Sequence, residues 1–128
     1  MEVTQFIANK EDSTFFDSLV NNLRNCSEFK MSVAFISWGG LQKFFPIFED
    51  LERRNIKGQI LTTTYENFTK PEVLQKINSF KNLELKVYVP NSEKNGFHTK
   101  GYLFQQNDQW TIIIGSSNIT QRALKTNQ

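Results

Sequence analysis

Apolar residues alternate along the chain between the spacing of helices and the spacing of strands. The first helical pattern has apolar residues three or four positions apart: Phe15, Phe16, Leu19, Val20, Leu23 and Cys26. Asp12 or Ser13 is its predicted N-cap. Residues 31–37 (MSVAFIS) form a nearly continuous apolar run, which predicts a strand covered on both faces. Gly39 and Gly40 then predict a break.

Two further helices follow from the same spacing. The second carries Leu41, Phe44, Phe45, Phe48 and Leu51. Pro46 lies inside that pattern, so this helix is expected to be kinked or to start late. Thr69 and Glu72 form a predicted capping box at the start of the third helix, and Pro71 falls in its first turn.

The remaining patterns predict strands. Residues 59–64 (QILTTT) form one, and residues 83–89 alternate as a half-exposed strand that ends at Pro90. Residues 99–105 and 109–115 are predicted to pair as a hairpin around Asn107 and Asp108, with a short helix over 117–124. These elements predict an α/β fold, with a mixed β-sheet flanked by helices on both faces.

Composition narrows the functional classes only a little. A chain of 128 residues is expected to form one domain, and its net charge of +2 names no partner. From residue 94 onward the chain has four Lys and Arg residues and one acidic residue, Asp108. This local positive charge would suit a polyanion, but such an excess is common on solvated faces. Cys26 is the only cysteine, so we expect a buried thiol in a reducing compartment. With one Cys and one His the sequence has no metal-ligand cluster of zinc spacing, so we expect no metal or other cofactor. Neither a signal peptide nor a membrane-spanning run is evident, so we expect a cytoplasmic protein.

The candidate chemistry lies at the two ends of the predicted hairpin. His98 and Lys100 are two positions apart at the start of one strand, so their side chains should share a face. Ser116 and Asn118 follow the next strand, where a helix N-terminus would add amide donors that favour an anion. Such donors around a histidine suit a phosphodiester, whose phosphorus the histidine would attack.

An ordinary structural interpretation remains open for each of these residues. His98 can be a surface histidine beside a solvated lysine, and Ser117 or Asn118 can be a helix N-cap. Each feature alone favours this interpretation. The order of the two clusters and their placement on one hairpin favour the phosphate site.

The pairs His98-Thr99-Lys100 and Gly115-Ser116-Ser117-Asn118 resemble the HxK and GSxN signature of the phospholipase D superfamily. Longer segments are similar to the phospholipase D-like domain attached to bacterial DEAD/DEAH-type helicases and restriction enzymes. These segments read VAFIS, ILTTTYENFTKPEVL, FHTKGYLF and IIIGSSNITQRALKTN. The resemblance covers most of the chain from about Met31 onward. It implies a single phospholipase D-like domain over residues 1–128, expected to be a fragment of a longer helicase or restriction protein.

The resemblance implies a role for each motif residue. His98 would be the nucleophile, Lys100 and Asn118 would bind the phosphate oxygens, and Ser116 would line the same pocket. Residues 62–65 and Thr69 match family positions near the site, where a strand-end or helix-cap role is an equal alternative.

The sequence departs from the family pattern at two points. Gln105 stands where the superfamily places an aspartate seven residues after the histidine, which disfavours lipid hydrolysis more than nuclease activity. The chain also stops at Gln128, one residue before a glutamate that relatives commonly carry.

Three functions are compatible with these observations. The leading hypothesis is a metal-independent phosphodiesterase that cleaves DNA as part of a helicase or restriction system, with an attached helicase domain in the parent protein. The second is a catalytically silent DNA-binding module, and the third, ranked last, is a phospholipid hydrolase or phosphatidyl-transfer enzyme. With one histidine per chain, the resemblance also implies a homodimer in which two copies of the motif face one phosphate.

Overall fold

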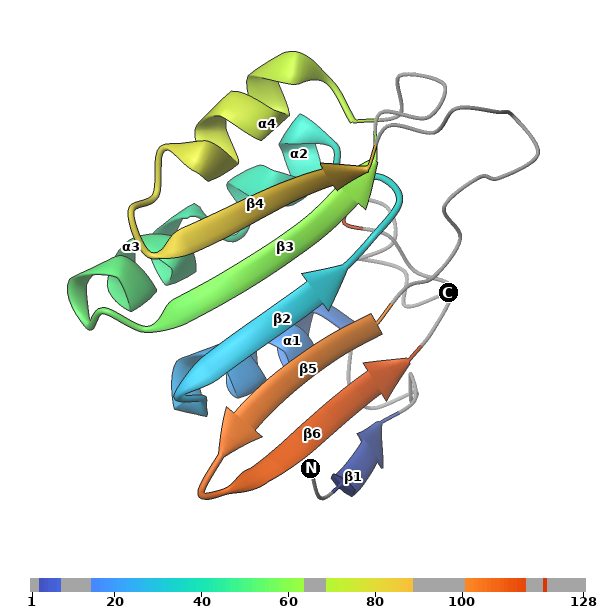
Figure 1. Cartoon of the computed structure of the whole chain (residues 1–128), viewed down its shortest axis with the longest axis vertical. Helices are drawn as coiled ribbons and strands as arrows, with labels where there is room; N and C mark the ends of the chain where they lie inside the picture. Colours follow the sequence, from blue (N-terminus) through green and yellow to red (C-terminus); the bar gives the residue numbers. More distant parts are fainter. Residues whose placement is uncertain (1–2, 8–14, 64–68, 89–100, 115–118, 120–128) are drawn as a thin grey trace.

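The chain folds into one six-stranded sheet with helices packed against it (Figure 1). The computed structural model describes residues 3–7, 15–63, 69–88, 101–114 and 119. The sheet order is β1-β6-β5-β2-β3-β4. The bounds of the strands are β1 Val3–Ile7, β2 Glu28–Ser32, β3 Lys57–Thr63, β4 Leu83–Tyr88, β5 Gly101–Gln106 and β6 Gln109–Ile114.

All strands except β5 run in the same direction, so the sheet is mixed as expected. The predicted hairpin of β5 and β6 is confirmed, and its turn residues Asn107 and Asp108 have φ values of 53° and 66°. Asparagine and aspartate adopt these left-handed angles more readily than other residues with side chains. Their two positive φ values match the turn type that fits the twist of a two-residue hairpin.

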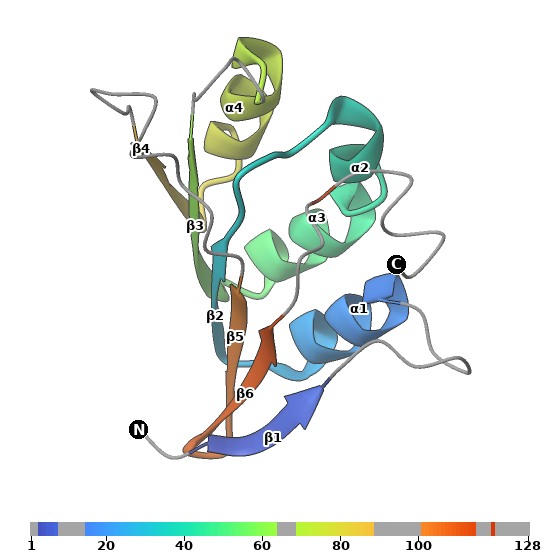
Figure 2. The same ribbon diagram turned by 90° about the vertical axis from the view of Figure 1, so that its right-hand side faces the viewer.

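The four described helices all lie on one face of the sheet, which Figure 2 shows edge-on. Burial alternates accordingly, because Phe29 and Met31 of β2 are buried while Lys30 between them is exposed. The α/β class is confirmed, but no described helix covers the second face, where the sequence predicted another helical layer. The strand predicted over 31–37 is wrong in its bounds: β2 ends at Ser32, and Val33, Ala34 and Ile36 are buried in the segment that leads to α2.

The first helix, α1 (Phe15–Asn25), follows its predicted pattern, whereas the second divides into two. α2 spans Trp38–Gln42 and α3 spans Phe45–Arg53, with Pro46 in the first turn of α3. Proline fits there because the amide it lacks has no helical partner. Gly39 and Gly40 lie inside α2 instead of breaking the chain, because the Ser37 hydroxyl accepts a hydrogen bond from the Gly40 amide (3.0 Å) and caps that helix.

Between β3 and β4 the chain forms α4 (Pro71–Asn78), again with proline in the first turn. The predicted capping box is wrong. The N-cap residue is Lys70, it makes no side-chain cap bond, and the Thr69 hydroxyl bonds elsewhere. The Thr69 hydroxyl, which the local motif assigned to the helix, instead accepts a hydrogen bond from the backbone amide of Ile36.

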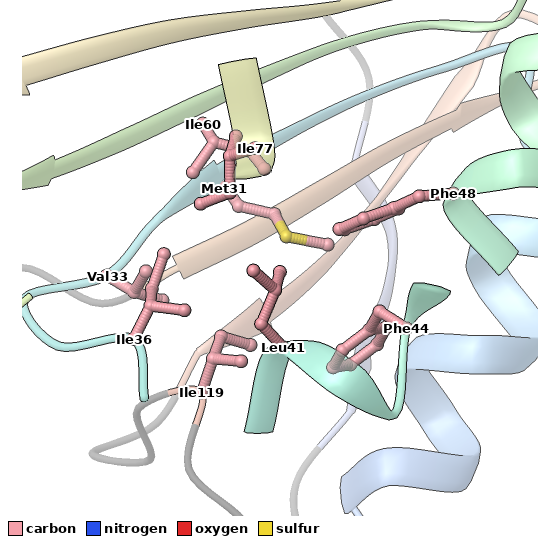
Figure 3. A pocket seen from close by; sticks show the side chains of 9 residues that line it. All are labelled: Met31, Val33, Ile36, Leu41, Phe44, Phe48, Ile60, Ile77 and Ile119. Carbon is pink, nitrogen blue, oxygen red and sulfur yellow. The ribbon is translucent and has the colours of Figure 1, made fainter. Parts of the chain in front are cut away.

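The core lies between the helices and the sheet, and phenylalanine rings form its centre. The Phe48 ring stacks on the rings of Phe44 (5.6 Å between centroids) and Phe29 (6.3 Å) and meets Phe80 edge-on (5.6 Å). A cavity of about 10 Å³ beside them has an entirely apolar lining (Figure 3). A space of this size and lining stays dry and holds no ligand.

Several other predictions have definite outcomes. Cys26 is buried as expected, just past the end of α1, and burial raises the pKa of its thiol to about 11. β1 was not predicted from the sequence. Ile119 pairs with Ile36 in an isolated β-bridge, so the helix predicted over 117–124 is wrong at that residue. The predicted N-caps at Asp12 and Ser13, the strand end at Pro90 and the rest of that helix lie outside the described residues.

Candidate functional site

The four predicted site residues, His98, Lys100, Ser116 and Asn118, lie outside the described residues. The structure therefore leaves their predicted roles untested. It does describe the residues to which both motifs are covalently joined. Gly101 follows Lys100 directly, and Ile114 and Ile119 stand on either side of residues 115–118.

Both motifs are joined to the same edge of the sheet. Gly101, the first residue of β5, pairs with Ile114, the last residue of β6. Because β5 runs against the other strands, its start lies at the edge where those strands have their carboxyl ends. One transverse row of paired residues crosses the sheet next to this edge: Ile114, Gly101, Ser32, Leu61 and Lys86. Ligands of open α/β sheets bind outside such carboxyl ends.

Ile119 is fixed on both sides of its backbone. Its amide donates to the Phe35 carbonyl (3.1 Å), and its carbonyl accepts from the Ser37 amide (2.9 Å). Its side chain is buried and lies beside those of Ile36 and Leu41 at the apolar cavity (Figure 3). In the sequence, residues 115–118 are therefore flanked by two fixed residues, Ile114 in β6 and Ile119 in this bridge.

Two buried threonines lie behind this edge. Thr62 of β3 is fully buried and Thr69 is 2% exposed. Their hydroxyl oxygens are 3.3 Å apart, and the Thr69 hydroxyl also accepts a hydrogen bond from the Ile36 amide (3.1 Å). The sequence placed Thr62 and Thr69 near the site without fixing their role. The structure shows the two hydroxyls hydrogen-bonded to each other, and only the Thr69 hydroxyl bonded to the segment that carries the Ile119 bridge.

Gln105, where the superfamily has aspartate, lies toward the far end of β5. It lies four positions after Gly101, which at the rise of a strand corresponds to about 13 Å. Its carbonyl accepts hydrogen bonds from the Ser27 amide (2.8 Å) and hydroxyl (3.2 Å). The departure from the family pattern therefore lies at a distance from the edge that carries the motifs.

The helix-free face, meaning the face of the sheet that none of the described helices covers, has a groove of about 260 Å³ that reaches the transverse row. Lys30 and Lys86 lie along it beside apolar residues such as Leu61 and Leu103. Lys86 forms an ion pair with Glu84 (3.5 Å), and the Lys30 ammonium lies 5.7 Å from the centre of the Trp110 ring. Part of the positive charge of this groove is thus already neutralised.

Perturbed ionisable groups in the described ranges lie away from the edge or deep in the core. The Arg54 guanidinium holds the pKa of the Asp50 carboxyl below its usual value, on the surface of α3. Burial raises the pKa of the Tyr102 phenol, whose ring meets Phe15 edge-on at 5.3 Å. Over the described ranges no three His, Cys, Asp or Glu side chains are grouped as metal ligands. None of the described helices is long and apolar enough to cross a membrane.

Comparison with models of known protein families matches most of the chain. The family model described as cardiolipin synthase, PLD-like domain, matches residues 19–128. This range includes both motifs and every described strand except β1. No curated protein matches the chain.

Proposed function

This chain belongs to the phospholipase D-like domain family, and from that premise we propose that it is a phosphodiesterase that cleaves DNA without a metal ion. Members of this superfamily are generally phosphodiesterase hydrolases. The observation that supports the proposal best is the pairing of Gly101 with Ile114, because the residues joined to the two motifs are direct neighbours in the sheet. The similarity of the longer segments to helicase-associated domains favours DNA as the substrate and an attached helicase or restriction domain in the parent protein.

In the proposed reaction His98 attacks phosphorus and forms a covalent phosphohistidine while the leaving oxygen departs. Lys100, Ser116 and Asn118 hold the non-bridging oxygens, whose negative charge grows in the transition state. Water then attacks phosphorus, displaces the histidine and releases the second product. Each step exchanges one bond to phosphorus for another, so neither an oxidant nor a metal is required.

The leaving oxygen needs a proton from the side opposite the nucleophile, because displacement at phosphorus is roughly in line. The chain has only one histidine. We therefore propose a homodimer with twofold symmetry, in which His98 of the second copy donates that proton. The same residues of each chain would then meet across the site.

The central experiment measures hydrolysis of bis-p-nitrophenyl phosphate by the wild type and by His98→Ala and Lys100→Ala. Both variants should lose nearly all activity while keeping the wild-type circular dichroism spectrum. Lys57→Ala is the matched control and should keep full activity. Lys57 is an exposed lysine at the amino end of β3, on the edge of the sheet opposite the one to which the motifs are joined. Full activity in His98→Ala would overturn the nucleophile assignment. A wild type that binds DNA without turnover would indicate the silent binding module instead.

A second candidate is phosphatidyl transfer or phospholipid hydrolysis, which the description of the matching family favours. Pockets for drug-sized ligands usually measure about 300–1,000 Å³. The groove on the helix-free face, at about 260 Å³, is therefore small for a lipid. Cleavage of single- and double-stranded DNA, compared with headgroup release from phosphatidylglycerol vesicles, separates the two. Release from vesicles with intact DNA would support the lipid enzyme.

A further inference from the structure

Thr69 receives the only hydrogen bond that the backbone amide of Ile36 donates in the described structure. In the bridge to Ile119, the hydrogen bonds involve Phe35 and Ser37, the neighbours of Ile36 on either side. The amide of Ile36 therefore has its hydrogen-bond partner in Thr69 and not in the bridge. Ile36 is 2% exposed, so without the Thr69 hydroxyl this amide would be buried and unsatisfied.

The Thr69 hydroxyl is itself held in place by Thr62. The two oxygens lie 3.3 Å apart, and Thr62 belongs to β3, whose pairing with β2 and β4 makes it part of the rigid sheet. An unbroken series of contacts therefore leads from β3 to the bridge. It runs from Thr62 to Thr69, from Thr69 to the Ile36 amide, and from the residues flanking Ile36 to Ile119.

We infer that Thr69, supported by Thr62, is a positioning residue of the phosphate-binding site. Asn118 precedes Ile119 directly in the sequence, and consecutive Cα atoms are about 3.8 Å apart. A shift of the Ile119 backbone is therefore expected to be transmitted to Asn118. Thr69 acts through Ile36 and Ile119 and touches neither substrate nor the reacting atoms. This inference rests on the proposed function, in which Asn118 binds the phosphate.

Two observations set this role apart from ordinary helix capping or core filling. The start of α4 has no side-chain cap bond, so the Thr69 hydroxyl does not serve the helix that follows it. Both threonines are buried, and the Thr69 hydroxyl bonds a backbone amide that lies 33 residues earlier in the chain. A misplacement of about 1 Å far from the chemistry can reduce the rate about a hundredfold. Small shifts of the bridge are therefore expected to matter.

The test compares Thr69→Val, Thr69→Ser and Thr62→Val with the wild type. Valine keeps the branched shape and removes the hydroxyl, whereas serine keeps the hydroxyl. Thr111→Val is the matched control, because Thr111 is a buried threonine in β6 whose hydroxyl takes no part in this series of contacts. All four variants are studied well below their unfolding temperatures.

The first readout is hydrogen exchange of the backbone amides of Ile119 and Ser37. Thr69→Val should speed their exchange at least about tenfold without changing the amides of the β5–β6 hairpin, and Thr69→Ser should restore protection. Unchanged exchange at Ile119 in Thr69→Val would overturn the inference, whatever the protein catalyses. This readout does not depend on activity, so it separates failure of the inference from failure of the proposed function.

The second readout is the steady-state kinetics of bis-p-nitrophenyl phosphate hydrolysis. Thr69→Val should lower kcat by about ten- to a hundredfold with a smaller change in KM, because a displaced amide supports the transition state less well. Thr69→Ser should recover most of kcat, and Thr111→Val should match the wild type. If the wild type turns over and Thr69→Val has an equal kcat, Thr69 is not a positioning residue. An inactive wild type would instead refute the proposed function and leave the exchange result to decide on the bridge.

Discussion

A single methyl group added at Gly58 should destabilise the fold, because the Phe29 ring leaves no room for it. Gly58 lies in β3 opposite Phe29 of β2, and a Cβ added there would stand 2.1 Å from the nearest ring carbon and within 2.6 Å of two more. Ordinary carbon contacts begin near 3.5 Å, so the ring would have to move by about 1.4 Å. The Phe29 ring is fully buried and stacked on Phe48, so it has no free space into which to move.

Gly58→Ala should therefore lower the free energy of unfolding by about 1–3 kcal/mol, the usual cost of overpacking a core. For a domain of this size that corresponds to a melting temperature lower by about 4–12 °C. Gly101→Ala is the control, because it is also a strand glycine and a Cβ there has nothing within 4 Å. That variant should be neutral or gain a few tenths of a kcal/mol to about 1 kcal/mol, because alanine restricts the unfolded chain.

Thermal and urea unfolding of both variants check this prediction. A third variant isolates the cause, since Phe29→Leu removes the ring that Gly58→Ala would strike. In that background the cost of Gly58→Ala should shrink by about 0.5 kcal/mol or more. A Gly58→Ala protein as stable as Gly101→Ala, or costs that simply add in the double variant, would refute the reasoning.

Three further predictions concern the thiol, the chemistry and the assembly. Burial raises the pKa of Cys26 from 9.0 to about 11, so the folded state holds this proton more tightly; the stability it adds is complete below about pH 9 and lost by about pH 11. Urea unfolding at both pH values should show a larger loss in the wild type than in Cys26→Ala, and equal losses would contradict the assignment. Phosphodiesterase activity should survive EDTA, because the groups proposed to bind phosphate are cationic or neutral; complete inhibition that magnesium reverses would count against the mechanism. In a purified heterodimer of wild type and His98→Ala, activity per wild-type site should fall severely, whereas near-normal activity would exclude a shared site.

Local patterns in the sequence predicted those elements whose signal lies within a few residues. The β5–β6 hairpin follows from alternating apolar residues and from Asn107 and Asp108, which tolerate the positive φ of its turn. The helix α1 follows from the spacing of its apolar face, and Pro46 and Pro71 mark helix starts because proline removes an amide that is not needed there. The family motifs are likewise short and ordered, so the sequence was sufficient to identify the superfamily that the family match then showed.

Features that depend on distant partners were missed or assigned wrongly. The pairing of β1 with β6 joins segments about a hundred residues apart, and nothing within five residues of β1 signals it. The run at 31–37 has the composition of a buried strand, yet its second half leaves the sheet, and Ile36 pairs with Ile119 instead. The apolar composition of this run indicated correctly that it is buried. A buried segment does not have to be a strand, so composition alone did not give its conformation.

Thr69 shows most clearly the difference between what local sequence predicts and what tertiary structure decides. Its sequence neighbours predicted a helix cap, because Thr69 and Glu72 have the spacing of a capping box. The folded chain brings the buried amide of Ile36 to the same hydroxyl, and an unsatisfied amide in the interior costs more than an uncapped helix end that water can reach. The sequence by itself determined the hairpin, the main helices and the motifs of the candidate site. Only the tertiary structure decided which segments meet at the carboxyl edge of the sheet, because that depends on hydrogen bonds and packing between residues that are far apart in the chain.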